Sequence, residues 1–252
     1  MPSLAIKEGF VVTPSRIPRS LASFIWAKFA VSIKNFIYLE IFATKIVQIK
    51  RLTKMPDIDQ LYWEHRYKNA QTGWDIGYAS PALTNYINQL ESKNLRILIP
   101  GCGNAYEAEF LLENQFENIT LIDIARPLVE QIEQKFAHSI AQNKLKVLHT
   151  DFFEHNGEYD LILEQTFFCA IPPQKRLGYA KKMHELLTPS GKLSGLLFDM
   201  PMLGEEPPFG GNRDEYRELF APYFQIQTLE PCTNSIKPRA GRELFFVLKK
   251  TK

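Results

Sequence analysis

The sequence has few cysteines, and they are not clustered. Cys102, Cys169 and Cys232 are widely spaced and form no Cys-x-x-Cys pair. Three isolated cysteines predict neither a disulfide framework nor a zinc site, and they favour a reducing compartment, here the cytoplasm. The five histidines are also scattered, without a His-Glu-x-x-His motif. We therefore expect no metal ligands.

The chain also lacks an overall excess of charge. Its 252 residues include 30 Lys and Arg against 28 Asp and Glu, which gives a formal net charge of +2. These nearly equal counts lack the excess of basic residues that is typical of nucleic-acid-binding proteins, so we expect no nucleic-acid partner. A composition with 45% hydrophobic and 23% charged residues is that of a globular protein and excludes a disordered chain.

The positive charge is concentrated at the N-terminus. Residues 1–54 contain nine Lys or Arg and two Glu, so we separate this basic extension from a slightly acidic domain over residues 55–252. Charged residues interrupt the apolar stretch of this extension, residues 21–48. It therefore contains no uninterrupted span of about 20 apolar residues, the length needed to cross a membrane. Three interpretations remain open: an amphipathic helix on a membrane surface or on the domain, a targeting segment, or a functionless extension before a natural start at Met55.

Short apolar runs alternate with helical patterns in the domain, which is typical of βαβ units and a parallel sheet. We predict strands over 96–100, 119–123, 145–148, 159–164 and 192–199. We predict helices over 105–113, 127–138, 174–187 and 214–220, with a turn at 188–191. Two last strands, 224–229 and 244–249, lack a helical crossover and predict an antiparallel hairpin. The expected fold is α/β: a mostly parallel seven-stranded sheet with helices on both faces, and a monomer.

A glycine loop, Gly101-Cys102-Gly103, follows the first predicted strand, and Asp123 ends the second strand 22 residues after Gly101. Ligands bind at the carboxyl ends of parallel strands, where glycine permits close approach of the backbone. A carboxylate at the end of the second strand can accept both ribose hydroxyl hydrogens. Tyr106 stands where a dinucleotide fingerprint needs its third glycine. The loop therefore favours a nucleoside without phosphates over a nicotinamide dinucleotide.

Two aromatic groups could contact such a ligand. Asp151 and Phe152 follow the third strand, where a carboxylate and a ring would lie near adenine, although Phe pairs at strand ends are more often part of the core. Trp63 and Trp74 lie 11 residues apart in a polar segment. Their faces would favour a sulfonium cation, and they could equally be hydrophobic anchors.

Seven passages, in order along the chain, carry a family resemblance. They are Tyr62–Tyr67, Gly73–Gly77, Ile99–Gly103, Asp151–Phe153, Glu164–Ala170, Leu187–Gly191 and Gly204–Phe209. Together they resemble the thiopurine methyltransferase family, and above all its branch of plant and microbial halide and thiol methyltransferases. The resemblance covers about residues 60–250. It implies a Rossmann-like class I fold and S-adenosylmethionine as the co-substrate.

Position by position, the resemblance implies roles for eight residues. Three aromatic residues would cover the co-substrate, Gly101 would contact its methionine part and Asp123 its ribose. Asp151 and Phe152 would lie near the adenine, and Gln165 would face the sulfonium. Plant members carry Tyr where Gln165 stands, and Gly is common where Ser190 stands. The cofactor-binding set is Trp63, Tyr67, Trp74, Gly101, Asp123, Asp151, Phe152 and Gln165.

Methyl transfer to a soft nucleophile needs proximity, alignment and exclusion of water, so we assign no catalytic residue. The expected acceptor is a small molecule: a thiol, a thiopurine-like compound, a halide or a related anion. For thiols of higher pKa, His65, Arg66 and Arg242 are candidates for a nearby base or cation. Cys102 and Cys169 are expected to be small buried residues and not nucleophiles.

A loop rich in glycine and proline, Gly204–Asn212, is expected to cover an apolar acceptor chamber together with Trp63 and Trp74. The predicted chamber residues are Phe167, Phe168 and Phe209. Two alternatives of other kinds remain: a non-catalytic S-adenosylmethionine-binding or interaction protein, and a methyltransferase with an oxygen, nitrogen or macromolecular acceptor.

Overall fold

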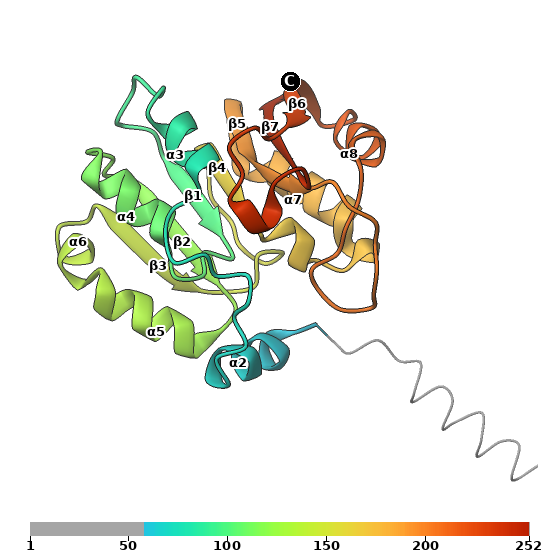
Figure 1. Ribbon diagram of the computed structural model, residues 1–252. Coiled ribbons are helices and arrows are strands. Elements are labelled where there is room, and N and C mark those ends of the chain that lie inside the picture. Colours follow the sequence, from blue (N-terminus) through green and yellow to red (C-terminus); the bar gives the residue numbers. More distant parts are fainter. Residues whose placement is uncertain (1–57, 252) are drawn as a thin grey trace, which may run out of the picture. The chain divides into compact units, whose positions relative to one another are not determined.

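The computed structural model describes residues 58–251 (Figure 1). The predicted basic extension, residues 1–54, and its suggested membrane contact therefore lie outside the described residues. Over residues 58–251, no helix is both long and apolar enough to cross a membrane.

A seven-stranded sheet forms the centre of the fold, in the order β3-β2-β1-β4-β5-β7-β6. Strands β1 to β5 run parallel to one another, and β7 pairs antiparallel with both β5 and β6. The predicted mostly parallel sheet with a C-terminal antiparallel pair is thus confirmed. The bounds are β1 Ile97–Pro100, β2 Ile119–Asp123, β3 Leu145–His149, β4 Tyr159–Gln165, β5 Leu187–Phe198, β6 Phe224–Pro231 and β7 Glu243–Lys250.

Helices connect the parallel strands and also precede the sheet. The bounds are α2 Gln60–Lys68, α3 Pro81–Ile87, α4 Tyr106–Glu113, α5 Arg126–Lys135, α6 Ala137–Ala141, α7 Arg176–Leu186 and α8 Arg213–Phe220. Three 3-10 turns are η1 Phe168–Ala170, η2 Pro173–Lys175 and η3 Lys237–Arg239. The helix predicted over 127–138 is divided at Phe136 into α5 and α6, and α2 and α3 were not predicted.

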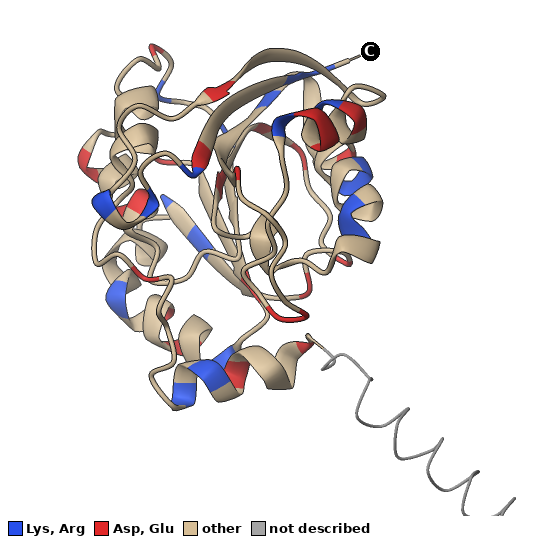
Figure 2. Ribbon diagram, turned by 45° about the vertical axis from the view of Figure 1, so that its right-hand side comes forward, with Lys and Arg blue, Asp and Glu red and all other residues tan. Residues whose placement is uncertain are grey.

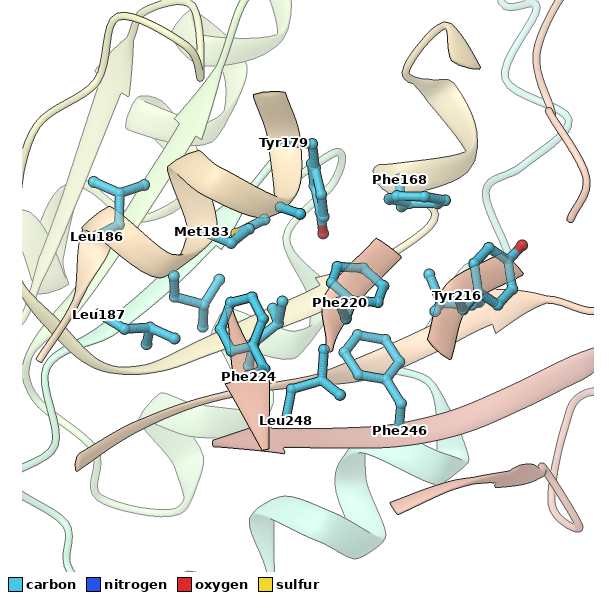
Figure 3. Close-up of a cluster of buried hydrophobic side chains, with 14 of the residues drawn as sticks. Phe168, Tyr179, Met183, Leu186, Leu187, Tyr216, Phe220, Phe224, Phe246 and Leu248 are labelled. Carbon is cyan, nitrogen blue, oxygen red and sulfur yellow. The ribbon is translucent and has the colours of Figure 1, made fainter. Parts of the chain in front are cut away.

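Both faces of the sheet are covered by helices, as predicted. Successive strand residues point to opposite faces, so Ile97 and Ile99 of β1 pack with α3, α4 and α5, whereas Leu98 packs with α7 and α8. Figure 3 shows the apolar cluster beneath α7 and α8, in which Phe220 of α8 packs against Phe224 of β6 and Phe246 of β7. The two apolar layers hold the carboxyl ends of β1, β2 and β4 in fixed relative positions.

The turn predicted over residues 188–191 is wrong in its placement. Strand β5 already begins at Leu187, and it pairs with β4 from Tyr159 onward. The register shifts between Tyr159 and Leu161, so the extra residues of β5 form a bulge. Proline suits a bulged position because it has no N–H to donate. A Cβ on Gly191 would lie 3.0 Å from the Tyr159 carbonyl oxygen, which explains the glycine.

Candidate active site

A cavity of ≈ 500 Å³ lies at the carboxyl edge of the parallel strands. Its wall includes residues that follow β1, β2, β3 and β4, together with α2 and the segment between α2 and α3. A cavity of this size is large enough to enclose most of a small-molecule ligand. The residues predicted to bind the cofactor all line it: Trp63, Tyr67, Trp74, Gly101, Asp123, Asp151, Phe152 and Gln165.

The glycine loop has a backbone that only glycine adopts readily. Gly101 and Gly103 have φ angles of +56° and +52°, in the left-handed region. A Cβ on Gly101 would lie 2.3 Å from the ring of Phe167. The loop therefore requires glycine for its conformation and for its contact with the segment that follows β4.

Asp123 is a buried carboxylate at the end of β2, with an exposed fraction of 7%. Its Oδ1 accepts a hydrogen bond of 2.9 Å from the backbone N–H of Ala125. Burial raises the pKa of Asp123 to about 6, while backbone N–H groups of Ala125 and Gly103 oppose this rise. At neutral pH the group is thus an ionised acceptor, suited to hydroxyl donors.

Three aromatic rings form one cluster beside the cavity. Trp74 packs edge-to-face against Trp63 at 5.5 Å and against Tyr67 at 5.7 Å between ring centroids. The guanidinium of Arg66 lies 5.3 Å from the Trp74 ring and donates to the Tyr62 hydroxyl. Trp74 therefore already has a cation of the protein against it, and it is both an anchor for its segment and part of the cavity wall.

The segment that carries Trp74 is fixed on two sides. Asp75 accepts hydrogen bonds from the Asn104 amide and, at 3.3 Å, from the Tyr106 hydroxyl, both of which follow the glycine loop. On the other side, Arg239 of η3 donates to the Trp74 carbonyl oxygen at 2.6 Å. Neither contact was predicted from the sequence.

Glu164, within β4, is a fully buried carboxylate that does not line the cavity. It accepts hydrogen bonds from the backbone N–H groups of Phe167 and Phe168, both at 2.9 Å, and from the Tyr179 hydroxyl at 2.8 Å. Burial raises the pKa of Glu164 to about 7. The carboxylate fixes the turn after β4, and through it the Phe167 ring against Gly101. A glutamate directly after the apolar run Leu161–Leu163 was the available signal for this role.

The predicted acceptor chamber is only partly correct. Phe167 lines the cavity, but Phe168 and Phe209 are each 1% exposed and do not. Phe168 instead packs edge-to-face on Tyr179, 4.9 Å away, because the turn η1 directs it into the core. A backbone hydrogen bond of 2.7 Å to Cys169 holds Phe209 inward, so Pro207 and Pro208 of this loop line the cavity.

The loop after β5 also approaches α2. The charge of Glu206 contributes to the raised pKa of Tyr62, whose main cause is burial. Figures 1 and 2 agree that this loop lies close to the start of α2. The predicted juxtaposition of the loop with the segment around Trp63 is therefore present.

Of the candidate bases and cations, Arg66 and Arg242 line the cavity. His65 is exposed and does not line it, because it lies on the outer side of α2. Cys102 and Cys169 are buried, as predicted, although both contribute to the cavity wall. Burial raises the pKa of both thiols, so they remain protonated. Among residues 58–251, no cluster of three or more His, Cys, Asp or Glu could hold a metal ion.

Comparison with known proteins gives a consistent result. The profile of the thiopurine S-methyltransferase family matches residues 58–246. The chain is 30% identical to a probable thiol methyltransferase 2 of Arabidopsis thaliana over 72% of this chain and 81% of that protein. It is 28% identical to thiocyanate methyltransferase 1 of Brassica oleracea, with the same coverage.

Among solved structures, the fold is similar to a Burkholderia thailandensis 1,6-didemethyltoxoflavin-N1-methyltransferase with bound S-adenosylhomocysteine. The TM-score is 0.61 at 18% identity, over 77% of this chain and 87% of that one. This likeness concerns the fold.

Proposed function

Since the chain belongs to the thiopurine S-methyltransferase family, we propose that it methylates a small soft anion and that the eight residues named above bind the methyl donor. The protein is an S-adenosylmethionine-dependent methyltransferase. The observation that carries the proposed site is that these eight residues, spread from Trp63 to Gln165, line one cavity.

The donor part of the cavity suits a nucleoside that carries a sulfonium. The buried Asp123 carboxylate is the acceptor for the ribose hydroxyls, and hydrogen bonds of this charge-assisted kind contribute more than neutral ones. Gly101 lines the cavity with its backbone, and the Phe167 ring fills the space that a Cβ there would need, so the methionine part would contact the loop backbone beside this ring. Gln165 also lines the cavity. Its buried Oε1 accepts no hydrogen bond from residues 58–251, and we assign this side chain to the sulfonium end of the donor.

The acceptor part is bounded by cations and apolar groups. Arg239, Arg242 and Lys175 line the cavity along with Pro207 and Pro208. A cationic wall favours an anionic acceptor, and an apolar cover removes the water that would otherwise solvate it. A soft anion such as a thiolate, iodide or thiocyanate fits both conditions.

The reaction needs no proton transfer with such an acceptor. A lone pair of the acceptor forms a bond to the methyl carbon, while the bond between that carbon and the donor sulfur breaks with its electron pair left on sulfur. The donor loses its positive charge and the acceptor its negative charge. The role of the chain is to align the two reactants and exclude water.

A turnover screen with methyl-labelled S-adenosylmethionine tests the proposal. Thiocyanate, iodide, hydrosulfide and a thiopurine represent the soft acceptors, and a phenol and a primary amine represent oxygen and nitrogen acceptors. Label should move to the soft acceptors. Transfer to the phenol or amine alone would refute the proposed acceptor class.

A further inference from the structure

Arg176 is a buried cation at the start of α7, with an exposed fraction of 8%. Its Nη2 donates to the carbonyl oxygen of Gly210 at 2.7 Å, although the two residues are 34 positions apart in the sequence. Its guanidinium lies 4.6 Å from the centre of the Phe168 ring, and its Nε is buried and forms no hydrogen bond within residues 58–251. An apolar side chain would fill this space without the cost of burying a charge. The distinctive contribution of the arginine is therefore its hydrogen bond to Gly210.

This hydrogen bond lies at the base of the loop 200–212. Met200 and Gly211 exchange backbone hydrogen bonds of 3.0 Å and 2.9 Å, which closes the base. A Cβ on Gly210 would lie 2.2 Å from the Met200 carbonyl oxygen, so the two ends of the loop are in direct contact. Arg176 therefore binds a closed base, whose two ends cannot shift independently.

The base of the loop is attached to the segment that follows β4. Arg176 makes one attachment, and the N–H of Phe209 makes another by donating to the Cys169 carbonyl oxygen at 2.7 Å. The same segment contributes Phe167 and Cys169 to the cavity wall. The loop is thus positioned relative to the cavity through residues 209 and 210.

The part of the loop that lines the cavity directly precedes these attachments. Pro207 and Pro208 line it, whereas residues 201–206 are exposed and do not. Because Pro208 is the neighbour of Phe209, the attachments decide how far the two prolines reach into the cavity. The residues predicted to bind the donor belong to other elements, so a shift of the loop would enlarge the acceptor part and leave the donor part in place.

We propose that Arg176 is a positioning residue for the methyl acceptor. By holding the Gly210 carbonyl, it keeps Pro207 and Pro208 at the distance from the donor that encloses a small anion. This inference rests on the proposed function. Without the hydrogen bond, the base of the loop would move outward and water would reach the acceptor. Acceptor binding should then weaken, while donor binding should stay unchanged.

Steady-state kinetics of Arg176→Met with thiocyanate, together with titration calorimetry of S-adenosylhomocysteine, tests this role. Methionine replaces a buried cation by an apolar chain, a change that folds often tolerate. The acceptor KM should rise about fivefold or more, with the dissociation constant of S-adenosylhomocysteine within about twofold of the wild-type value. Arg217→Met, in an exposed residue of α8 that pairs with Asp214, should match the wild type in both measurements.

Hydrogen–deuterium exchange gives a second readout, which depends on no acceptor. The N–H groups of Phe209 and Gly211 are hydrogen-bonded in the base of the loop. They should exchange about tenfold or more faster in Arg176→Met, while exchange in β2 should not change. An unchanged acceptor KM, unchanged exchange, or an equal loss of donor affinity would each overturn the proposal.

If Arg176→Met does not fold, Arg176→Lys replaces it. The lysine ammonium ends one bond short of the position of Nη2 and lacks the guanidinium fork, so the acceptor KM should rise about twofold or more, and an unchanged value would overturn the proposal. If the turnover screen moves label only to the phenol or the amine, the acceptor class is refuted, and the KM of that acceptor should still rise. Turnover of thiocyanate with a wild-type KM in both variants would refute only the role of Arg176.

Discussion

Replacing Glu164 by Gln should make the stability of the protein less dependent on pH. The carboxylate is fully buried and its pKa is about 7, above its ordinary value of 4.5. The folded state therefore binds this proton more tightly than the unfolded state. The contribution of Glu164 to the unfolding free energy is fully present below about pH 4.5. It is lost as the pH rises through about 7, because the folded protein must then ionise a buried group.

The size of this loss follows from the difference between the two pKa values. One pKa unit corresponds to about 1.4 kcal/mol, so ionisation of Glu164 costs about 3 kcal/mol of unfolding free energy. Gln is nearly isosteric and does not ionise. Its Oε1 can accept from the N–H groups of Phe167 and Phe168, and its amide can donate to the Tyr179 oxygen.

Urea denaturation at about pH 5 and about pH 8 measures the effect. The variant should approach wild-type stability at the lower pH and exceed it at the higher pH by up to about 3 kcal/mol. Other titrating groups act on both proteins and cancel in the comparison. Glu205→Gln, which changes an exposed loop carboxylate, should follow the wild type at both values. Parallel curves for wild type and Glu164→Gln would refute the assignment of a buried, ionising carboxyl at this position.

Three other predictions concern the substrate site and the extension. Asp123→Ala should weaken S-adenosylhomocysteine binding by roughly 1.5–3 kcal/mol in calorimetry. In the wild type, affinity should fall as the pH decreases through about 6, where Asp123 takes up a proton; an unchanged, pH-independent affinity would remove the ribose assignment. Trp74→Ala should lower turnover of soft anions about tenfold or more with a smaller change in thermal midpoint, and wild-type turnover would make Trp74 an anchor only. Deleting residues 1–54 should leave turnover unchanged, and an inactive product would show that the extension is required.

The elements that the sequence predicted well are those with local signals. Apolar strands that end at Asp123, or just before Gly101 and Asp151, could be placed at one sheet edge because parallel strands share it. The family resemblance added Tyr67 and Gln165, and it supported Trp63 and Trp74, whose residue types alone left both a ligand contact and an anchor open. Local patterns and the resemblance together named eight residues that all line one cavity.

The missed residues act through contacts that are distant in sequence. Arg239 binds a backbone carbonyl, which leaves no complementary side chain to detect at position 74. The orientation of Phe168 depends on the turn that the Glu164 carboxylate fixes. Whether a ring faces the core or the cavity is decided there by one backbone turn, and composition does not report it.

The sheet order separates the two halves of the reaction along the chain. The predicted donor residues end or follow β1 to β4 or precede the sheet. The loop 200–212 and the connection between β6 and β7 supply Pro207, Pro208, Arg239 and Arg242 to the wall, and of the residues assigned above to the acceptor part of the wall only Lys175 of η2 lies before β5. Both of these connections lie in the last fifth of the polypeptide and carry no strand of the parallel core. Acceptor choice can therefore diversify by substitutions in these two connections as long as Arg239 is kept, because it holds the Trp74 segment of the methyl-donor half. Chimaeras between relatives with different acceptors are best joined within β5.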